Sequence, residues 1–328
     1  MVLVVGGAGY IGSHICKLLR ELGEPHIVFD NLEKGHLASI PGSKLFRGDL
    51  RNQSDIERVF AENQDIETVM HFAAYIEVGE SVAKPSEFYE NNVIGVKRLI
   101  DCMVDRQVKQ FIFSSTAALF GEPKYSPIDE AHPVGPTNPY GETKLAVERM
   151  LAAYDQAYGL KSVCLRYFNA SGADPEGQLG EDHHPESHLI PLILFAALGK
   201  RDSIKVFGVD YPTPDGTCVR DYIHVSDLAK AHVLALKHLR QAGESKRFNL
   251  GNGIGFSVQE VIKAAKSVTG LPINVVVADR RPGDSPILVG SSEAIRREWG
   301  WVPEYPDLTT IIEHAYRWFV SHPDGYGD

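Results

Sequence analysis

The chain has 328 residues, 43% hydrophobic and 23% charged, which is ordinary for a globular protein of one or two domains. Its formal net charge of −10 argues against a general affinity for nucleic acid or anionic membrane surfaces. The sequence contains no recognisable secretory signal or membrane-spanning stretch, and its four cysteines form no C-x-x-C motif. These properties predict a cytoplasmic protein with reduced thiols.

Short apolar runs alternate with amphipathic stretches in the first half of the chain. The pattern predicts strands at 2–5, 26–29, 68–72, 110–114 and 162–167, and helices near 11–22, 54–63, 86–106 and 141–158. Near-continuous apolar strands separated by helices are typical of a parallel sheet covered on both faces. We therefore expect an α/β fold with a doubly wound parallel sheet of the Rossmann type.

The composition changes near residue 170, where a long stretch rich in Gly, Asp, His and Pro begins. We expect residues 1–170 to form the Rossmann domain and residues 171–328 to form a smaller mixed α/β lobe. Part of 218–255 is a candidate to rejoin the first sheet. The remaining predicted elements are strands at 247–250 and 274–277 and helices near 226–240, 257–269 and 307–320.

A glycine-rich turn follows the first strand and opens the first helix, which is the context that a dinucleotide-binding fingerprint requires. Gly6 suits the tight turn, Gly9 lets a pyrophosphate approach the backbone, and Gly12 permits close packing of helix and strand. Tyr10 and Ile11 begin the helix, whose N-terminal N–H groups favour phosphate. The turn therefore predicts a dinucleotide site.

Asp30 ends the second strand, where a carboxylate accepts a hydrogen bond from the ribose 2′-hydroxyl. A 2′-phosphate would meet like charge there, and no arginine follows directly, because the next residue is Asn31 and then Leu32 and Glu33. This pattern favours NAD over NADP.

Other residues after strands are candidates for the same groove. Asp49, followed by Leu50, either borders the adenine or caps the helix near 54–63, and the sequence leaves both interpretations open. Phe72 and Ala73 follow the next strand and are expected to line the cofactor groove with apolar atoms.

Tyr140 and Lys144 stand four residues apart in a predicted helix, so they lie on one face about one turn apart. A tyrosine that acts as a base needs a nearby cation, because its unperturbed pKa is near 10. At roughly 6 Å and an effective dielectric of about 20, an ammonium stabilises a phenolate by about 3 kcal/mol. The pair therefore predicts a group that deprotonates a hydroxyl.

A Ser-Ser-Thr run ends the strand before this helix, at the sheet edge where ligands bind in such folds. Thr116 is the candidate to bridge the phenol and a substrate oxygen. Ser114 and Ser115 are more simply explained as partners of strand-end backbone groups.

Together, the glycine turn, Thr116 and the Tyr140-x-x-x-Lys144 pair resemble the extended short-chain dehydrogenase/reductase superfamily. Within it, the chain is similar nearly end to end to the UDP-glucose 4-epimerases (UDP-galactose 4-epimerases). The motifs that carry this resemblance are His71-Phe72-Ala73-Ala74, Val78-Gly79-Glu80-Ser81, Tyr89-Glu90-Asn91-Asn92, Leu165-Arg166-Tyr167-Phe168-Asn169, Ile204-Lys205-Val206-Phe207-Gly208, Asp215-Gly216-Thr217-Cys218-Val219-Arg220-Asp221-Tyr222-Ile223-His224-Val225 and Arg281-Pro282-Gly283-Asp284.

The resemblance implies interconversion of UDP-glucose and UDP-galactose through NAD-dependent oxidation at the sugar C4 and a 4-keto intermediate. Tyr140 would remove the 4-hydroxyl proton, Thr116 would orient that hydroxyl, and Lys144 would hold the nicotinamide ribose. The implied NAD site comprises Gly6, Gly9, Tyr10, Ile11, Gly12, Asp30, Asn31, Asp49, Leu50, Phe72, Ala73, Asn91, Ser114, Lys144 and Tyr167. The implied substrate site comprises Thr116, Tyr140, Asn169, His188, Leu189, Lys205, Phe207, Arg220, Tyr222, Arg281, Asp284 and Leu288.

Arg220 and Arg281 suit the substrate diphosphate, since guanidinium groups match phosphate oxygens, and Phe207 suits the uracil. The resemblance also implies a homodimer that pairs the helices near 86–106 and 141–158, although ordinary core packing explains their apolar faces equally well. Leu288 lies where the family is thought to gate sugar size, so use of N-acetylated sugars stays open.

Three positions raise further questions. Ile76 replaces a lysine that some epimerases place near the cofactor, and His188 replaces an asparagine found in many, which leaves its role open. His183, His184 and His188 do not have a standard zinc spacing, so we expect a solvated loop and no metal.

Two rival functions are weighed against the epimerase. A sugar-nucleotide 4,6-dehydratase needs an acid–base pair to eliminate water. The dehydratases carry this pair directly after the threonine that corresponds to Thr116, whereas this chain has Ala117 and Ala118 there. An NAD-binding sensor or scaffold usually lacks the tyrosine or the lysine, and both are present.

Overall fold

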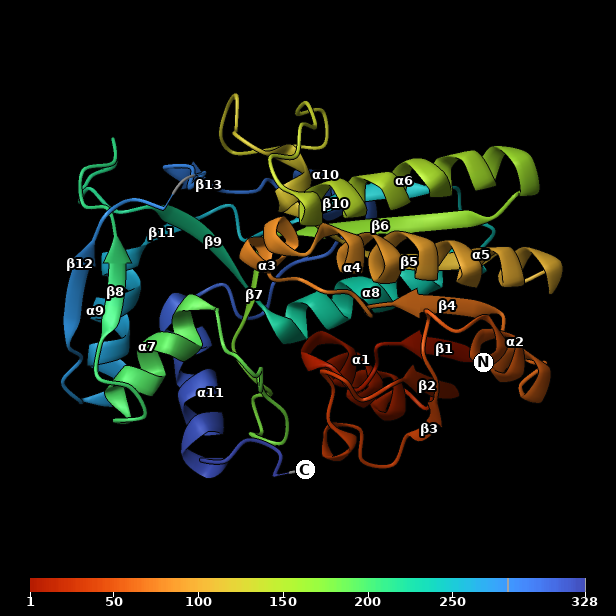
Figure 1. Ribbon diagram of the computed structural model, residues 1–328, viewed down its shortest axis with the longest axis horizontal. Coiled ribbons are helices and arrows are strands. Elements are labelled where there is room, and N and C mark those ends of the chain that lie inside the picture. Colours follow the sequence, from red (N-terminus) through yellow and green to blue (C-terminus); the bar gives the residue numbers. More distant parts are fainter. Residues whose placement is uncertain (282, 328) are drawn as a thin grey trace.

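The computed structural model describes residues 1–281 and 283–327. Its centre is a parallel sheet of seven strands in the order β10-β6-β5-β4-β1-β2-β3 (Figure 1). The strands are β1 (Val2–Val5), β2 (His26–Asp30), β3 (Lys44–Arg47), β4 (Thr68–His71), β5 (Gln110–Thr116), β6 (Lys161–Tyr167) and β10 (Lys246–Leu250). The predicted doubly wound α/β fold is confirmed, and the predicted strands differ from these by no more than two residues at either end.

Helices cover both faces of this sheet, because its central strands are apolar on both sides and all four residues of β1 are fully buried. One face packs against α1 (Tyr10–Glu21) and α8 (Val225–Arg240), through residues such as Ile15 and Leu228. The other packs against α2 (Gln53–Glu62), α5 (Val96–Asp105) and α6 (Pro139–Tyr158).

The single helix expected near 86–106 is wrong, because a π-helical turn interrupts it. After the short α3 (Val78–Ala83) come α4 (Pro85–Tyr89), the π-helical segment Glu90–Gly95 and then α5. The Asn92 side chain accepts a hydrogen bond from the Tyr75 backbone N–H at 2.9 Å and donates one to the Tyr75 carbonyl at 2.9 Å. The π turn thus directs two asparagines inward, a common use of π turns near functional sites.

The second half of the chain adds a smaller mixed lobe, on the left in Figure 1. In it, β9 pairs with β11, β13 and β7, while β8 pairs in parallel with β12. Its core joins α7, α9 and α11 through residues such as Ile193, Ile262 and Trp318. The elements of this half are β7 (Asn169–Ser171), α7 (Leu189–Ala197), β8 (Ile204–Phe207), β9 (Val219–His224), β11 (Gly255–Ser257), α9 (Val258–Thr269), β12 (Val275–Ala278), β13 (Ile287–Leu288), α10 (Glu293–Trp299) and α11 (Leu308–Ser321).

The first sheet also contains a strand from beyond residue 170. Strand β10 pairs in parallel with β6, with Phe248 opposite Leu165, and α8 packs on the same face as α1. Elements from the second half therefore complete the first sheet and its cover. Among the helices within 1–281 and 283–327, none is long and apolar enough to cross a membrane.

Candidate active site and cofactor groove

The glycine turn between β1 and α1 is built for close approach. A Cβ atom on Gly12 would lie 2.3 Å from the Gly6 carbonyl oxygen, and one on Gly6 would lie 2.4 Å from the Ala73 nitrogen. Gly9 is the N-cap of α1, where no side chain caps the first N–H groups, and a Cβ there would lie 3.5 Å from the Gly6 carbonyl oxygen. These unoccupied donors and the positive end of the helix dipole fit a pyrophosphate, as predicted from the sequence.

Asp30 lies at the end of β2, beside this turn. Its carboxylate accepts hydrogen bonds from the backbone N–H groups of Ala8, at 3.0 Å, and Leu32, at 2.9 Å. Burial raises the pKa of Asp30, and these two N–H groups oppose the rise because they favour the charged form. The carboxylate is thereby held at the position where a ribose diol of a bound dinucleotide is recognised.

Asp49 does not cap a helix, so that interpretation is wrong. The N-cap of α2 is Asn52, whose side chain accepts a hydrogen bond from the Ser54 N–H at 3.1 Å. Asp49 instead contacts the Arg51 guanidinium at 2.6 Å and accepts a hydrogen bond from Asn31 at 3.0 Å. The Arg51 hydrogen bond lowers the pKa of Asp49 to about 2.

Arg51 was not singled out in the sequence, because it lies far along the chain from Asp30. It also contacts Glu33 at 2.6 Å, so two carboxylates balance its charge. The rim beyond Asp30 therefore presents no uncompensated cation to a 2′-phosphate, which agrees with the preference for NAD.

The remaining candidate cofactor residues line the sheet edge. Ala73 touches the Gly6 turn, and Leu50 is buried next to Gly95 in the π-helical segment. Asn91, in the same segment, donates to Asn92 at 2.9 Å. Phe72 packs its ring 4.9 Å from that of His232, between centroids.

Ser114 lies two residues before the end of β5, Tyr167 ends the neighbouring strand β6, and their hydroxyl groups are hydrogen bonded to each other. The Ser114 carbonyl accepts a hydrogen bond from the Lys144 ammonium at 2.7 Å. Lys144 is thus anchored at the carboxyl end of the sheet, next to the groove.

Tyr140 and Lys144 occupy the first two turns of α6, which begins after the N-cap Asn138. The Lys144 Nζ atom lies 6.0 Å from the centre of the Tyr140 ring, as expected from their spacing. Thr116, at the end of β5, lies near enough to Tyr140 for its hydroxyl to favour the phenolate and lower the pKa of Tyr140. The structure thus brings the three predicted catalytic side chains together.

The pKa shifts of Tyr140 and Lys144 do not follow the electrostatic expectation for this pair. Burial raises the pKa of Tyr140 to about 12, where the Thr116 hydrogen bond opposes the rise and the charge of Glu77 adds to it. Burial lowers the pKa of Lys144 to about 7, against the opposing charge of Glu148. The estimate from spacing assumed a solvated, fully charged lysine, whereas this lysine is buried and engaged by a carbonyl group.

A buried charged network behind the catalytic face was also missed. Glu148, one turn after Lys144, accepts hydrogen bonds from Arg166 at 2.6 and 3.0 Å and from Ser115 at 2.6 Å. The earlier explanation of Ser114 and Ser115 as partners of backbone groups is therefore wrong, because both hydroxyl groups contact side chains. The network ties α6 to β5 and β6, and it positions the Tyr140 turn.

The two arginines predicted to hold a diphosphate come together around Asp284. Arg220 lies 3.5 Å from the Asp284 carboxylate, and the Nε atom of Arg281 donates to the same carboxylate at 3.1 Å. The Arg281 guanidinium also lies 4.5 Å from the centre of the Phe207 ring. A flat aromatic face beside two guanidinium groups suits a base and a diphosphate.

The other candidate substrate residues have mixed surroundings. Asn169 donates to the Asp221 carbonyl at 2.7 Å, and Lys205 is exposed on β8 two residues before Phe207. Leu288 pairs with Arg220 and packs against the apolar cluster that follows Thr116. Tyr222 and Leu189 both belong to the apolar core of the second lobe.

The loop with three histidines is only partly solvated, contrary to our expectation, because the side chain of His184 is exposed while two carboxylates of the loop are buried. Glu181 is only 3% exposed, and the side chain of Glu186 is 5% exposed. His188 Nδ1 lies 2.6 Å from Glu181 and 3.3 Å from Glu186, so its imidazole faces carboxylates of its own loop.

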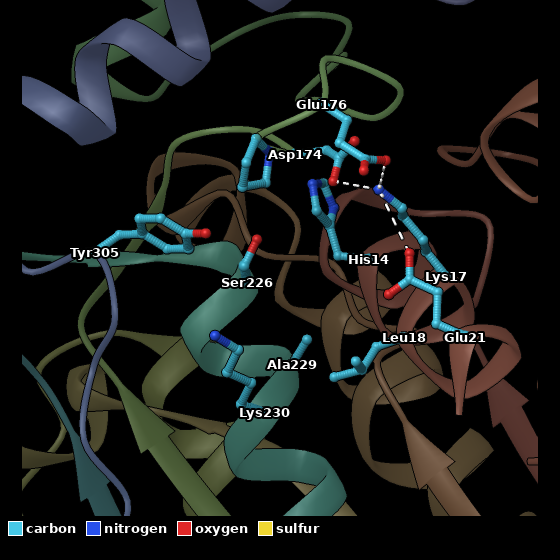
Figure 2. Close-up of a pocket in the computed structure, with 11 residues that line it drawn as sticks. His14, Lys17, Leu18, Glu21, Asp174, Glu176, Ser226, Ala229, Lys230 and Tyr305 are labelled. Atoms are coloured by element: carbon cyan, nitrogen blue, oxygen red, sulfur yellow. Dashed lines mark hydrogen bonds and ion pairs between the residues drawn. The ribbon is translucent and has the colours of Figure 1, made fainter.

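A surface pocket of about 230 Å³ lies between α1 and α8, away from these groups (Figure 2). Lys17 points across it to Asp174, at 2.6 Å, and to Glu176, at 3.0 Å (Figure 2). None of the candidate site residues lines it, so we do not assign it to the active site.

The fold and the site define an NAD-dependent enzyme of the Rossmann type, and the chain belongs to the NAD dependent epimerase/dehydratase family, whose model matches residues 2–251. The UDP-glucose 4-epimerase of Halalkalibacterium halodurans is 55% identical, over 99% of this chain and 97% of its own. That of Lacticaseibacillus casei is 48% identical, over 100% and 99%.

Solved structures agree with these relatives. A crystal structure of a UDP-glucose 4-epimerase matches with a TM-score of 0.97 and 52% identity, over 99% of both chains. The UDP-glucose 4-epimerase of Bifidobacterium longum, in complex with NAD+ and UDP, matches with a TM-score of 0.93 and 40% identity, over 99% of both chains.

Proposed function

We propose that this protein is an isomerase that interconverts UDP-glucose and UDP-galactose with NAD as its cofactor. The observation that carries the proposal is the convergence of Tyr140, Thr116 and Lys144 at the sheet edge that also holds the glycine turn. The relatives described above share about half of their residues with this chain over nearly its whole length, and this similarity supports the same activity. Bound NAD+ would accept a hydride from the sugar C4 and return it to the opposite face.

The residues of the groove fit such a cofactor. The N-terminus of α1 offers its first N–H groups to the pyrophosphate, and Gly9 leaves room for it. Asp30 receives the adenosine ribose, and Lys144 is placed to hold the nicotinamide ribose. Because several segments contribute contacts, we expect NAD to remain bound through purification.

Proton transfer falls to Tyr140 and Thr116. The Thr116 hydrogen bond favours the phenolate form of Tyr140, so the threonine both stabilises the base and marks where the sugar 4-hydroxyl docks. Tyr140 takes the proton of that hydroxyl during oxidation and gives it back during reduction. The network around Glu148 holds the helix that carries this tyrosine.

The substrate must be held by its nucleotide while the hexose turns. Arg220 and Arg281 bind the diphosphate, and the uracil lies near Phe207. Leu288 lies between these nucleotide-binding residues and the apolar cluster that follows Thr116, where it borders the space for the sugar. Because the leucine side chain is intermediate in size, turnover of N-acetylated sugars has to be measured directly.

Each rival function lacks support from the site. Elimination of water by a 4,6-dehydratase needs acids after Thr116, and the turn that follows has Ala117 and Ala118 there instead. A sensor or scaffold has no need for the Tyr140–Lys144 pair that is intact here.

The test is Tyr140→Phe, compared with Tyr158→Phe at the exposed far end of the same helix. We expect Tyr140→Phe to lower the turnover of UDP-galactose by at least about 10²-fold and to keep NAD content and UDP affinity, whereas Tyr158→Phe keeps all three. Near-normal turnover of Tyr140→Phe would contradict the mechanism.

Product analysis separates the rival chemistry. Mass spectrometry of reactions with UDP-glucose and UDP-N-acetylglucosamine should show products of unchanged mass. A product lighter by one water would instead identify a dehydratase.

We further propose a two-domain homodimer in the cytoplasm, with domains at 1–170 and 171–328, of which part of 218–255 belongs to the first sheet. The unpaired cysteines support a reducing compartment. Exposed Tyr89, Ile94 and Tyr158 on neighbouring helices α4 to α6 support a dimer face. Light scattering after size-exclusion chromatography measures the assembly, and a monomer at micromolar concentration would contradict the dimer.

A further inference from the structure

Four side chains of the loop between β7 and α7 converge on one point: Glu181, His183, Glu186 and His188. Each offers one ligand atom, and these four atoms all lie within 4.8 Å of one another. The Glu181 oxygen lies 2.6 Å from His188 Nδ1 and 3.1 Å from His183 Nδ1. Glu186 lies 3.3 Å from His188 Nδ1 and 3.9 Å from His183 Nδ1.

The contacts in this cluster are close but do not have the geometry of hydrogen bonds. Glu181 Oε1, His183 Nδ1, Glu186 Oε2 and His188 Nδ1 are all buried atoms without a hydrogen-bond partner in the described part of the chain. These atoms contact one another only as ion pairs, and buried polar atoms are almost always hydrogen bonded, so four such atoms facing each other require an explanation. The buried carboxylate of Glu181 is aimed at the common centre, as a ligand to an ion would be.

We propose that this cluster, which we call the loop cluster, binds a structural zinc ion through Glu181, His183, Glu186 and His188. Zinc takes four ligands tetrahedrally, at about 2.0–2.2 Å from imidazole nitrogen or carboxylate oxygen, which separates neighbouring ligand atoms by roughly 3.3 Å. The four imidazole–carboxylate separations of 2.6 to 3.9 Å surround that value, and all ligand atoms lie within 4.8 Å of one another. Two neutral imidazoles and two carboxylates carry two negative charges, which a dication balances.

Residues around the cluster support it from other parts of the chain. Trp318 of α11 donates to the Glu181 carbonyl at 3.1 Å, and the Tyr326 N–H donates to Asp182 at 2.9 Å. The ring of Tyr10, at the start of α1, meets that of His183 edge to face at 6.2 Å. Such outer contacts orient the ligands of metal sites.

The position of the cluster indicates what the ion would do. His188 is the N-cap residue of α7, in the second lobe, while Tyr10 begins the helix that receives the cofactor pyrophosphate. An ion at the loop cluster would therefore fix the 181–188 loop between the cofactor turn and the second lobe. No open coordination position is required, so the role is structural and the sugar chemistry does not depend on it.

The experiment compares purified wild-type protein, still holding its NAD, with Glu181→Gln and His183→Ala. The matched control is His184→Ala, which removes a histidine of the same loop whose side chain is 81% exposed and contacts Asp182 instead. Zinc content is measured by mass spectrometry after desalting, and affinity by titrating chelator-treated protein with ZnCl2 against a competing dye.

We expect one zinc per chain in the wild type and in His184→Ala, and an affinity at least about 10-fold lower in Glu181→Gln and His183→Ala. Cobalt(II) added to the chelator-treated wild type should give the intense visible absorption of four-coordinate cobalt. Equal zinc affinity in all four proteins, the absence of zinc binding to the wild type, or a pale six-coordinate cobalt spectrum would overturn the proposal. Glu181→Gln preserves side-chain size, and circular dichroism verifies that it folds.

Discussion

Replacing Glu148 by glutamine tests whether the buried network holds the catalytic helix in place. The Glu148 side chain is 2% exposed and that of its partner Arg166 is 6% exposed, so neither charge is solvated. Glutamine keeps the size of the side chain and an oxygen for the Ser115 hydroxyl, but it removes the charge that balances the guanidinium. Breaking a buried pair in this way costs about 3–5 kcal/mol, a large part of the 5–15 kcal/mol typical of folded proteins.

The assay is urea denaturation followed by circular dichroism, with turnover measured in parallel. The control is Glu80→Gln, which breaks an exposed, solvent-screened pair with Lys84 and should cost far less stability. Adding Arg166→Met to Glu148→Gln should recover most of the loss, because no unpaired charge then remains buried. A loss from Glu148→Gln no larger than that of the control would refute the role assigned to the network.

Three further outcomes follow from distances and burial described above. Gly12→Ala should lose bound NAD, since the added Cβ would lie 2.3 Å from the Gly6 carbonyl oxygen. The control Gly79→Ala, which has open space around the added Cβ, should retain NAD. The ultraviolet spectrum of the supernatant after denaturation measures the bound NAD in both variants. Burial lowers the pKa of Lys144 to about 7 in the folded protein. Between pH 7 and about 10, Lys144 is therefore protonated in the unfolded chain and neutral in the folded one. Lys144 thus makes wild-type stability rise over that window by up to about 1.4 kcal/mol per pH unit, and Lys144→Met should lack this slope in urea denaturation of NAD-free protein; equal slopes would contradict the buried lysine. Arg281→Ala should weaken UDP binding by about 10-fold or more in calorimetry, and unchanged affinity would remove this arginine from the nucleotide handle.

The sequence predicted what depends on local pattern. Strand β1 was placed at Val2–Val5 because an uninterrupted apolar run is what a strand buried on both faces requires. Tyr140 and Lys144 were placed on one face because helix geometry alone determines their separation. The glycine turn was predicted for the same reason, since its neighbours in sequence are also its neighbours in space.

The features that were missed depend on residues from distant parts of the chain. The shifts in pKa at Tyr140 and Lys144 follow from burial between β5 and α6, which no spacing rule contains. Glu148 and Arg166 belong to different elements, so their pairing appears only once the helix lies on the sheet. The loop cluster was predicted to be solvated because Trp318, which holds it from α11, lies more than a hundred residues later.

The return of β10 to the first sheet has a consequence for how the chain folds during synthesis. A ribosome releases residues 1–170 long before Lys246–Leu250, so the nascent sheet has β6 as its open edge. One face of that sheet also lacks α8, which leaves apolar residues such as Val163 and Leu165 without their cover. An unpaired strand with an apolar face is prone to aggregate. A gene truncated after residue 170 should therefore yield insoluble protein, and the nascent chain should be a client of chaperones until α8 and β10 have emerged.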